Sequence, residues 1–204
     1  MENQFPSSGM DEHPLRREIY KMIAQRFQIN SALYPGCGYD IVPSIYIPEV
    51  VYLDNFKAVA DFFSSREKLL NDLLGEKAYS GPCRISFYEM DYHSPINLPQ
   101  FDLLISQYAG DVGQAMKRFL RPGGILLVAE GPEDAELALK DPEYELLGTI
   151  TGADGKIELE PGLVPAAFLK LDFDALDPSG ILGQYGVPSI PIDRNFCFRK
   201  RFAP

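Results

Sequence analysis

Short apolar runs alternate with segments of helical periodicity along the first 140 residues of the chain. Between residues 15 and 27, apolar side chains recur at three- and four-residue spacing, which predicts a helix with one buried face. Comparable patterns predict further helices over 55–63, 64–74, 111–119 and 132–140. The apolar runs between them predict buried strands at 32–34, 50–53, 84–90, 101–106 and 125–129. This alternation favours a doubly wound α/β sheet with right-handed crossovers.

The last third of the chain has a different pattern, because its apolar runs follow one another without helical segments between them. Strands are expected at 144–150, 156–160, 166–173 and 196–202. The pair Asp154-Gly155 is a hairpin signal, so the sheet is expected to finish with antiparallel strands. No repeat or linker divides the chain, which predicts a single domain over 11–204 after a disordered leader at 1–10.

A glycine turn follows the first predicted strand. Gly36 and Gly38 are separated by one residue, and Asp54 stands directly after the next apolar run. Glycines allow a ligand to approach the backbone closely, and a carboxylate at the tip of the adjacent strand accepts hydrogen bonds from sugar hydroxyls. The pattern therefore predicts a nucleoside-like cofactor. Asp54 is also a candidate N-cap for the helix that starts at Asn55, and the two roles are compatible.

Composition and charge narrow the class of protein. The chain has 204 residues, of which 46% are hydrophobic and 24% charged, as in ordinary globular domains. Its formal net charge of −10, from 19 basic and 29 acidic residues, repels a phosphate backbone, so nucleic acid is not expected as a partner. No apolar run approaches the ~20 residues that span a bilayer, and residues 1–10 lack the pattern of a secretory signal. We expect a protein without a membrane segment.

The cysteines indicate a reducing compartment. The chain has three, Cys37, Cys83 and Cys197, far apart and without a Cys-x-x-Cys pair. Such an odd and scattered set favours neither a disulfide framework nor a zinc site. Histidines and carboxylates do not cluster at ligand spacing either, so no metal is expected, and a cytoplasmic location is predicted.

Four short motifs stand in a fixed order: the glycine turn at 34–40, Tyr-Leu-Asp at 52–54, Glu-Met-Asp-Tyr at 89–92, and Phe-Leu-Arg-Pro-Gly-Gly at 119–124. In this order they resemble the class I S-adenosylmethionine-dependent methyltransferases, over roughly residues 15–202. The resemblance implies a three-layer α/β sandwich with a seven-stranded, mostly parallel sheet and antiparallel C-terminal strands. It also implies S-adenosylmethionine as the cofactor and a small-molecule acceptor.

The resemblance further implies roles for particular residues. The glycines would approach the amino-acid and ribose parts of the cofactor, Asp54 would accept from the ribose hydroxyls, and Asp91 would face the adenine amine. The complete set expected to contact the cofactor is Tyr34, Gly36, Gly38, Asp54, Asn55, Asp91, Tyr92 and Ser106.

In this architecture the loop at 106–111 normally positions the reacting group. Gln107, Tyr108 and Asp111 are therefore the candidate catalytic residues that orient a substrate. Asp111 is alternatively only a helix N-cap. His93 is a candidate general base because its ordinary pKa lies near neutrality, or alternatively a surface residue before a turn.

Two positions depart from the family pattern. The glycine motif usually begins with a carboxylate and has a third small residue, and here those positions are Tyr34 and Asp40. They leave open a second function, a non-catalytic methyltransferase-like domain that binds a ligand or a protein. A third function, nicotinamide-dependent oxidoreduction, would require a third glycine where the chain has Ile41.

Overall fold

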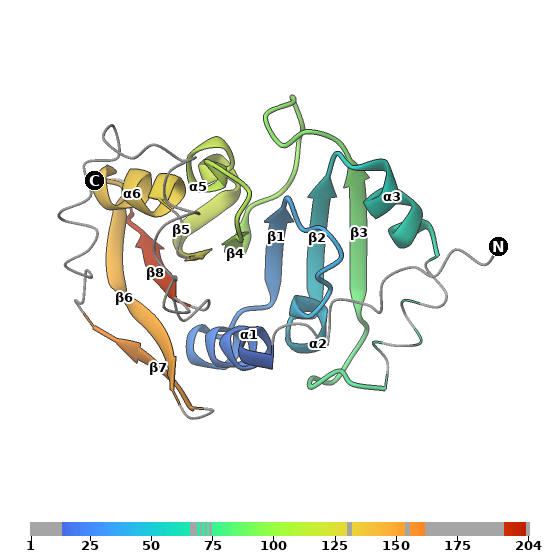
Figure 1. Ribbon diagram of the computed structural model, residues 1–204, viewed down its shortest axis with the longest axis horizontal. Coiled ribbons are helices and arrows are strands. Elements are labelled where there is room, and N and C mark those ends of the chain that lie inside the picture. Colours follow the sequence, from blue (N-terminus) through green and yellow to red (C-terminus); the bar gives the residue numbers. More distant parts are fainter. Residues whose placement is uncertain are drawn as a thin grey trace, which may run out of the picture.

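The computed structural model describes residues 14–65, 75–129, 132–153, 156–161 and 194–202, and the single positions 69, 71 and 73. Within these residues, eight strands form one sheet in the order β3-β2-β1-β4-β5-β8-β6-β7 (Figure 1). The parallel strands are β1 (Ser31–Pro35), β2 (Glu49–Asp54), β3 (Arg84–Glu89), β4 (Phe101–Ser106) and β5 (Leu120–Ala129). The antiparallel part consists of β6 (Tyr144–Ala153), β7 (Lys156–Glu160) and β8 (Asn195–Lys200). The predicted doubly wound sheet with antiparallel C-terminal strands is thus confirmed.

The sheet has eight strands where the resemblance implies seven, and the strand predicted at 156–160 is β7 at its edge. It pairs with β6 alone, from Thr149 opposite Glu160 to Ala153 opposite Lys156. Gly148 permits this pairing, because a side chain there would collide with the carbonyl oxygen of Glu160. The predicted strand at 166–173 and the predicted leader at 1–10 lie outside the described residues.

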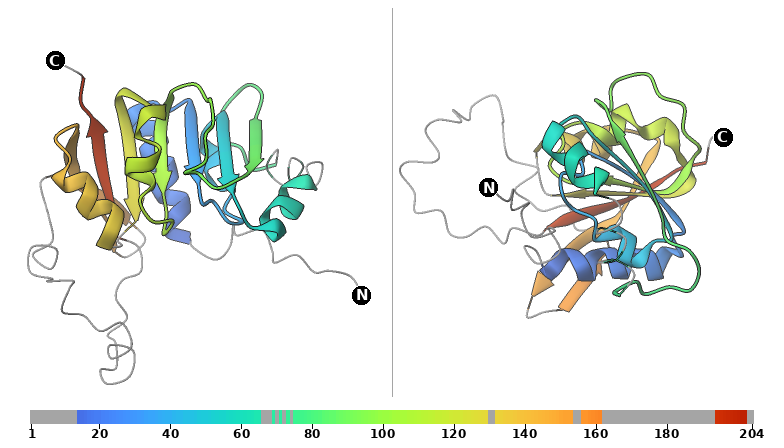
Figure 2. Two further views of the ribbon diagram at one scale, coloured as in Figure 1. Left: turned by 90° about the horizontal axis from the view of Figure 1, so that it is seen from above. Right: turned by 90° about the vertical axis from the view of Figure 1, so that its right-hand side faces the viewer.

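Alternate side chains of the central strands enter two separate cores, as the period of two in a strand requires. In β2, Val50 and Tyr52 belong to one core, whereas Val51 and Leu53 belong to the other. Side chains of α1 (Pro14–Phe27), α2 (Pro43–Tyr46) and α3 (Lys57–Ser64) pack into the first core. Side chains of α5 (Val112–Ala115), η1 (Lys117–Phe119) and α6 (Pro132–Lys140) pack into the second. Helices thus cover both faces of the sheet, which gives the predicted three layers (Figure 2).

Two elements differ more than the others from those expected. The predicted helix over 111–119 consists of the single turn α5 and the 3-10 turn η1. The predicted strand at 125–129 starts earlier, because Leu120 already pairs with Phe101 before the register shifts. None of the helices in the described part of the chain combines the length and apolar character needed to cross a membrane.

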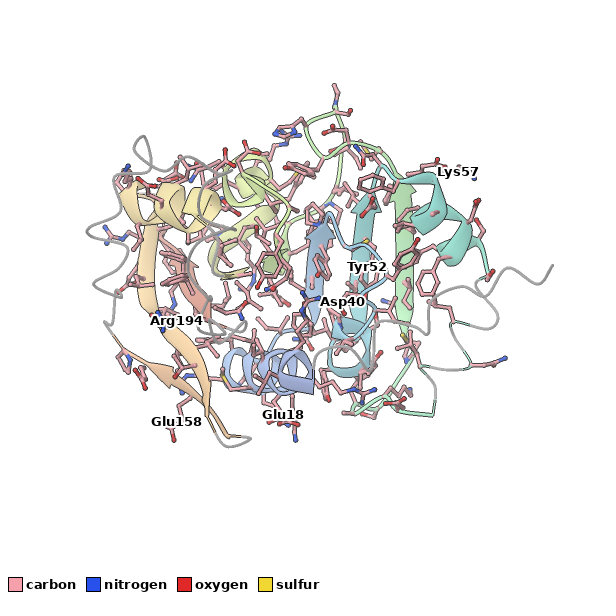
Figure 3. The ribbon with its side chains drawn as sticks, viewed as in Figure 1. Glu18, Asp40, Tyr52, Lys57, Glu158 and Arg194 are labelled. Atoms are coloured by element: carbon pink, nitrogen blue, oxygen red, sulfur yellow. The ribbon has the colours of Figure 1, made fainter. Side chains whose placement is uncertain are left out.

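Asp40 fastens α1 to the turn after β1 (Figure 3). Its carboxylate is 6% exposed and accepts hydrogen bonds from the hydroxyls of Tyr20, at 2.9 Å, and Tyr34, at 3.2 Å. The backbone N–H of Val42 donates at 3.0 Å, and Arg16 Nη1 lies 3.3 Å away. Burial raises the pKa of Asp40, while Arg16 and the hydroxyl donors act in the opposite direction. Asp40, one of the two residues that depart from the family pattern, is therefore a structural carboxylate directed toward α1.

Replacing Asp40 by Ala should destabilise the fold strongly. The change leaves two buried tyrosine hydroxyls and the Arg16 guanidinium without their acceptor, which we expect to lower the free energy of unfolding by about 3–5 kcal/mol. Urea denaturation measures the difference. Tyr20→Phe is the control: it removes one donor and keeps the ring, so it should cost about 1–3 kcal/mol. Equal losses in the two variants would contradict a central role for the carboxylate.

Candidate ligand site at the carboxyl edge of the sheet

Three connections meet where the parallel strands end. They are the glycine turn at 36–40, the post-β3 loop at 90–100 and the post-β4 loop at 107–111. The strand order β3-β2-β1-β4 makes β1 and β4 neighbours although they are distant in sequence. Their carboxyl ends form the switch point at which open α/β sheets bind ligands.

Asp54 ties the glycine turn to the end of β2. Its Oδ2 accepts from the backbone N–H of Gly38 at 2.9 Å, and its Oδ1 accepts from the N–H of Phe56 at 2.9 Å. Gly38 has a φ of +54°, and no atom lies within 4 Å of the position that its Cβ would take. This half of the turn therefore has a fixed carboxylate beside open space. The neighbouring Asn55 is exposed.

The other half of the turn is covered by the post-β4 loop. Gly36 has a φ of +63°, and a Cβ added to it would collide with the Cβ of Ala109. The backbone N–H of Gly36 donates to the carbonyl of Leu53 at 2.8 Å, which fixes the turn from below. Glycine is thus required at position 36 by the packing of Ala109 as well as by the backbone conformation.

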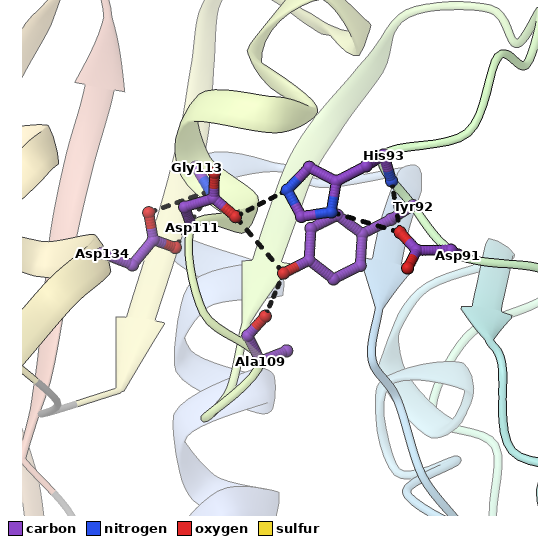
Figure 4. Close-up of polar contacts among 7 residues, drawn as sticks. All are labelled: Asp91, Tyr92, His93, Ala109, Asp111, Gly113 and Asp134. Atoms are coloured by element: carbon purple, nitrogen blue, oxygen red, sulfur yellow. Dashed lines mark hydrogen bonds and ion pairs between the residues drawn. The ribbon is translucent and has the colours of Figure 1, made fainter.

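The post-β3 and post-β4 loops are joined by polar contacts (Figure 4). His93 Nε2 lies 2.9 Å from Asp111 Oδ1, and His93 Nδ1 lies 3.1 Å from Asp91 Oδ1. The Tyr92 hydroxyl donates to the carbonyl oxygen of Ala109 and lies 3.4 Å from Asp111 Oδ1. The backbone N–H of His93 lowers the pKa of Asp91, whose carboxylate faces this histidine.

A buried polar network supports the post-β4 loop. Gln107 is 8% exposed, and its amide donates to Asn195 Oδ1 at 2.8 Å. The carboxylate of Asp134 accepts from the N–H of Gly113 at 2.9 and 3.0 Å and also bonds to the Ser106 side chain. Burial raises the pKa of Asp134 above its ordinary value.

A cavity of about 230 Å³ lies beside the post-β4 loop. Tyr108 and Gly110 form one wall, Val128 and Ala129 form the apolar floor, and Asp134 contributes a carboxylate. Glu133, at the start of α6, lines it as well. The cavity is small, mainly apolar and acidic at one end.

The structure sorts the site residues predicted from the sequence into groups. Gly36, Gly38 and Asp54 are contiguous, and Asp91, Tyr92 and Asp111 form a second cluster around His93. The Tyr34 ring is 1% exposed, and its hydroxyl is directed to Asp40 in the interior. Gln107 and Ser106 are buried, whereas the Tyr108 side chain is 58% exposed.

Three residues of the site were missed in the sequence: Ala109, Asn195 and, as a site residue, Asp134. The sequence carries a signal only for Asp134, which follows Pro132 at the start of a helix and is thus placed near the sheet edge. Within the described ranges, no group of three or more histidines, cysteines or carboxylates is arranged to hold a metal ion.

Comparison with known proteins bears on the fold. No family model and no curated protein matches the chain. Among solved structures, a putative O-methyltransferase from Klebsiella pneumoniae is similar with a TM-score of 0.55 and 13% identity, over 95% of this chain and 83% of that one. The N-methyltransferase NodS from Bradyrhizobium japonicum, in complex with S-adenosyl-L-homocysteine, is similar with a TM-score of 0.53 and 13% identity, over 94% and 90%. A putative methylase from Haemophilus influenzae gives 0.51 and 12%, over 92% and 97%. The chain therefore has the class I methyltransferase fold.

Alanine at the two glycines should have unequal effects. Gly36→Ala places an alanine in a left-handed backbone conformation and also makes it collide with Ala109, which we expect to lower the free energy of unfolding by about 2–4 kcal/mol. Gly38→Ala introduces the backbone strain alone and should cost about 1–2 kcal/mol. Chemical denaturation measures both.

The double variant tests the collision directly. Adding Ala109→Gly to Gly36→Ala should recover about 1–2 kcal/mol, because the two side chains are in contact and their effects are coupled. Additive losses would mean that the post-β4 loop does not lie on Gly36.

Proposed function

We propose that the protein is an S-adenosylmethionine-dependent methyltransferase that acts on a small-molecule acceptor. The observation that supports this most is the pairing of Asp54 with Gly38 at the switch point of a methyltransferase fold. NodS, which has this fold, is known in complex with S-adenosyl-L-homocysteine. We propose that this chain also binds S-adenosylhomocysteine, and that it binds S-adenosylmethionine as the methyl donor.

The residues around Gly38 fit such a ligand. A carboxylate can accept about four hydrogen bonds. Asp54 uses two of them for the N–H groups of Gly38 and Phe56, so its oxygens retain capacity for ribose hydroxyls. The space beside Gly38 would receive the sugar, with Asn55 at its rim. Asp91 and Tyr92, on the next connection, would border the adenine while Asp91 Oδ1 stays directed to His93.

The bound cofactor would supply an electrophilic methyl group. The protein's part would be to position the acceptor, since orientation alone is worth up to ~7–11 kcal/mol in favourable systems. We propose that the acceptor enters the 230 Å³ cavity, where Tyr108 forms the wall. Asp111 would orient it from the loop, and Gln107 would act through its bond to Asn195 by fixing the loop backbone.

A second candidate function rests on the contact between Ala109 and Gly36. With the post-β4 loop on the first glycine, the described structure is closed at the place where the amino-acid part of the cofactor would approach. A non-catalytic domain that binds a nucleoside or a protein would need no opening there. Oxidoreduction with a nicotinamide dinucleotide has less support, because Ile41 is fully buried where that fingerprint has its third glycine.

We also propose a reducing, cytoplasmic environment. All three cysteines are unpaired, and Cys37 and Cys197 are buried. Burial raises the pKa of both thiols, which disfavours their oxidation.

Calorimetric titration with S-adenosylmethionine and S-adenosylhomocysteine tests the proposed function. We expect micromolar dissociation constants for the wild type. Asp54→Ala should weaken binding about 10- to 100-fold, because hydrogen bonds to a charged group are lost.

Asp61→Ala is the matched control. It removes an exposed carboxylate of α3 that is paired with Lys57, and it should bind as the wild type does. Asp54→Asn keeps the shape of the side chain in case the alanine variant unfolds. Wild-type protein that is folded and binds neither compound would overturn the proposal, and unchanged affinity in both Asp54 variants would refute the ribose placement.

A further inference from the structure

One histidine connects the two loops that border the proposed ligand site. His93 belongs to the post-β3 loop, and its ring contacts Asp91 in the same loop and Asp111 in the post-β4 loop, at 3.1 and 2.9 Å. Its neighbour Tyr92 donates to the carbonyl of Ala109 (Figure 4). Residues 92 and 93 thus fasten the post-β4 loop at two points.

The ring of His93 is placed to donate from both nitrogens. Each nitrogen faces a carboxylate oxygen, and only the protonated imidazole has two N–H donors. The neutral ring would direct a lone pair at one of the two carboxylates. Loss of solvent lowers the pKa of His93, but the hydrogen bonds and charges of Asp111 and Asp91 outweigh this and raise it above the ordinary value. The bridge is therefore strongest when the ring is charged.

The loop that this bridge fastens covers half of the glycine turn. Ala109 lies on Gly36, whereas the space beside Gly38 is open. A nucleoside that touches only Gly38 and Asp54 needs no rearrangement. A ligand that extends along the whole turn reaches Gly36 only after Ala109 moves away.

We propose that His93 is a positioning residue of the ligand site, whose protonated ring fastens the post-β4 loop over Gly36 so that ligands with an amino-acid part bind only after this bridge opens. The inference rests on the proposed function. Asp91 and Asp111 face the ring directly, Tyr92 packs on it with centroids 4.4 Å apart, and Asp134 lies behind Asp111. These neighbours are anionic or neutral, so a charged ring is favoured from each side.

The sign of the pH effect follows from the bridge. A raised pKa in the folded state means that the bridge is complete at low pH and is lost as the pH rises through the pKa of His93. The loop then opens more often, and S-adenosylhomocysteine should bind more tightly.

Titration at about pH 6 and about pH 8.5, on either side of the histidine range, tests this. The wild type should bind S-adenosylhomocysteine about two- to fivefold more tightly at the higher pH, as expected when an exposed ion pair controls the open fraction. Adenosine, which does not reach Gly36, should bind equally at both. His93→Gln should bind S-adenosylhomocysteine as the wild type does at high pH.

Two comparisons remove other sources of pH dependence. The amino group of the ligand titrates identically for all variants, so the difference between wild type and His93→Gln isolates the histidine. His13→Gln, at the other histidine of the sequence, should retain the wild-type pH dependence. A wild-type affinity that changes with pH no more than that of His93→Gln overturns the inference, as does an equal change for adenosine.

Loop motion provides a readout that needs no ligand. Hydrogen exchange at the amides of residues 108–111 should be faster in His93→Gln than in the wild type at low pH. The chain has only two histidines, so the His93 ring can be followed by NMR. Its pKa should lie above ~6.5 and return toward that value in Asp111→Asn. The bridge is overturned if His93 titrates with an ordinary histidine pKa and hydrogen exchange at residues 108–111 is the same in His93→Gln as in the wild type. If neither the folded wild type nor any variant binds S-adenosylhomocysteine at either pH, the proposed function is overturned, and the exchange experiment then decides the bridge alone.

Discussion

The contact of Ala109 with Gly36 is the constraint around which the carboxyl edge of the sheet is organised. The strand order brings β1 beside β4, so the turns that follow these two strands have to share one space. They do so because position 36 has no side chain. The remaining features secure the two partners of this contact: Asp54 fixes the glycine turn to β2, and Tyr92 with His93 fixes the loop that carries Ala109.

The sequence predicts the elements whose side chains alternate between the two cores. In β1, Leu33 and its neighbours Ala32 and Tyr34 face opposite cores, and an apolar run is the direct signature of such a strand. It does not predict the early start of β5, because residues 121–124 form no apolar run and lie at the register shift between Leu120 and Ile125. Nor does it predict that the helix after Asp111 is a single turn followed by a 3-10 turn.

The residues of the candidate site likewise divide into those that the sequence predicts and those that it does not. Gly36, Gly38 and Asp54 could be predicted because a local motif brings them together. The partners of Asp40 and Gln107 could not, because Tyr20 and Asn195 lie 20 and 88 residues away and nothing local marks them. Asp40 illustrates the consequence. Its position in the glycine motif suggests that the Asp40 carboxylate faces the ligand. Its hydrogen bonds instead direct it into the protein interior.

The two candidate functions differ in whether the contact of Ala109 with Gly36 has to open. The free energy of opening can be compared with the free energy of cofactor binding. Uncovering a methyl group such as that of Ala109 costs about 0.8 kcal/mol, and a neutral hydrogen bond such as that of Tyr92 contributes about 1 kcal/mol. Micromolar binding releases about 8 kcal/mol. Opening the post-β4 loop therefore consumes only a part of what a cofactor with contacts at Asp54 and Gly38 would release. The contact of Ala109 with Gly36 is thus compatible with a methyltransferase whose cofactor displaces the post-β4 loop on binding. A non-catalytic domain would differ in that its ligand makes no contacts beyond Gly38.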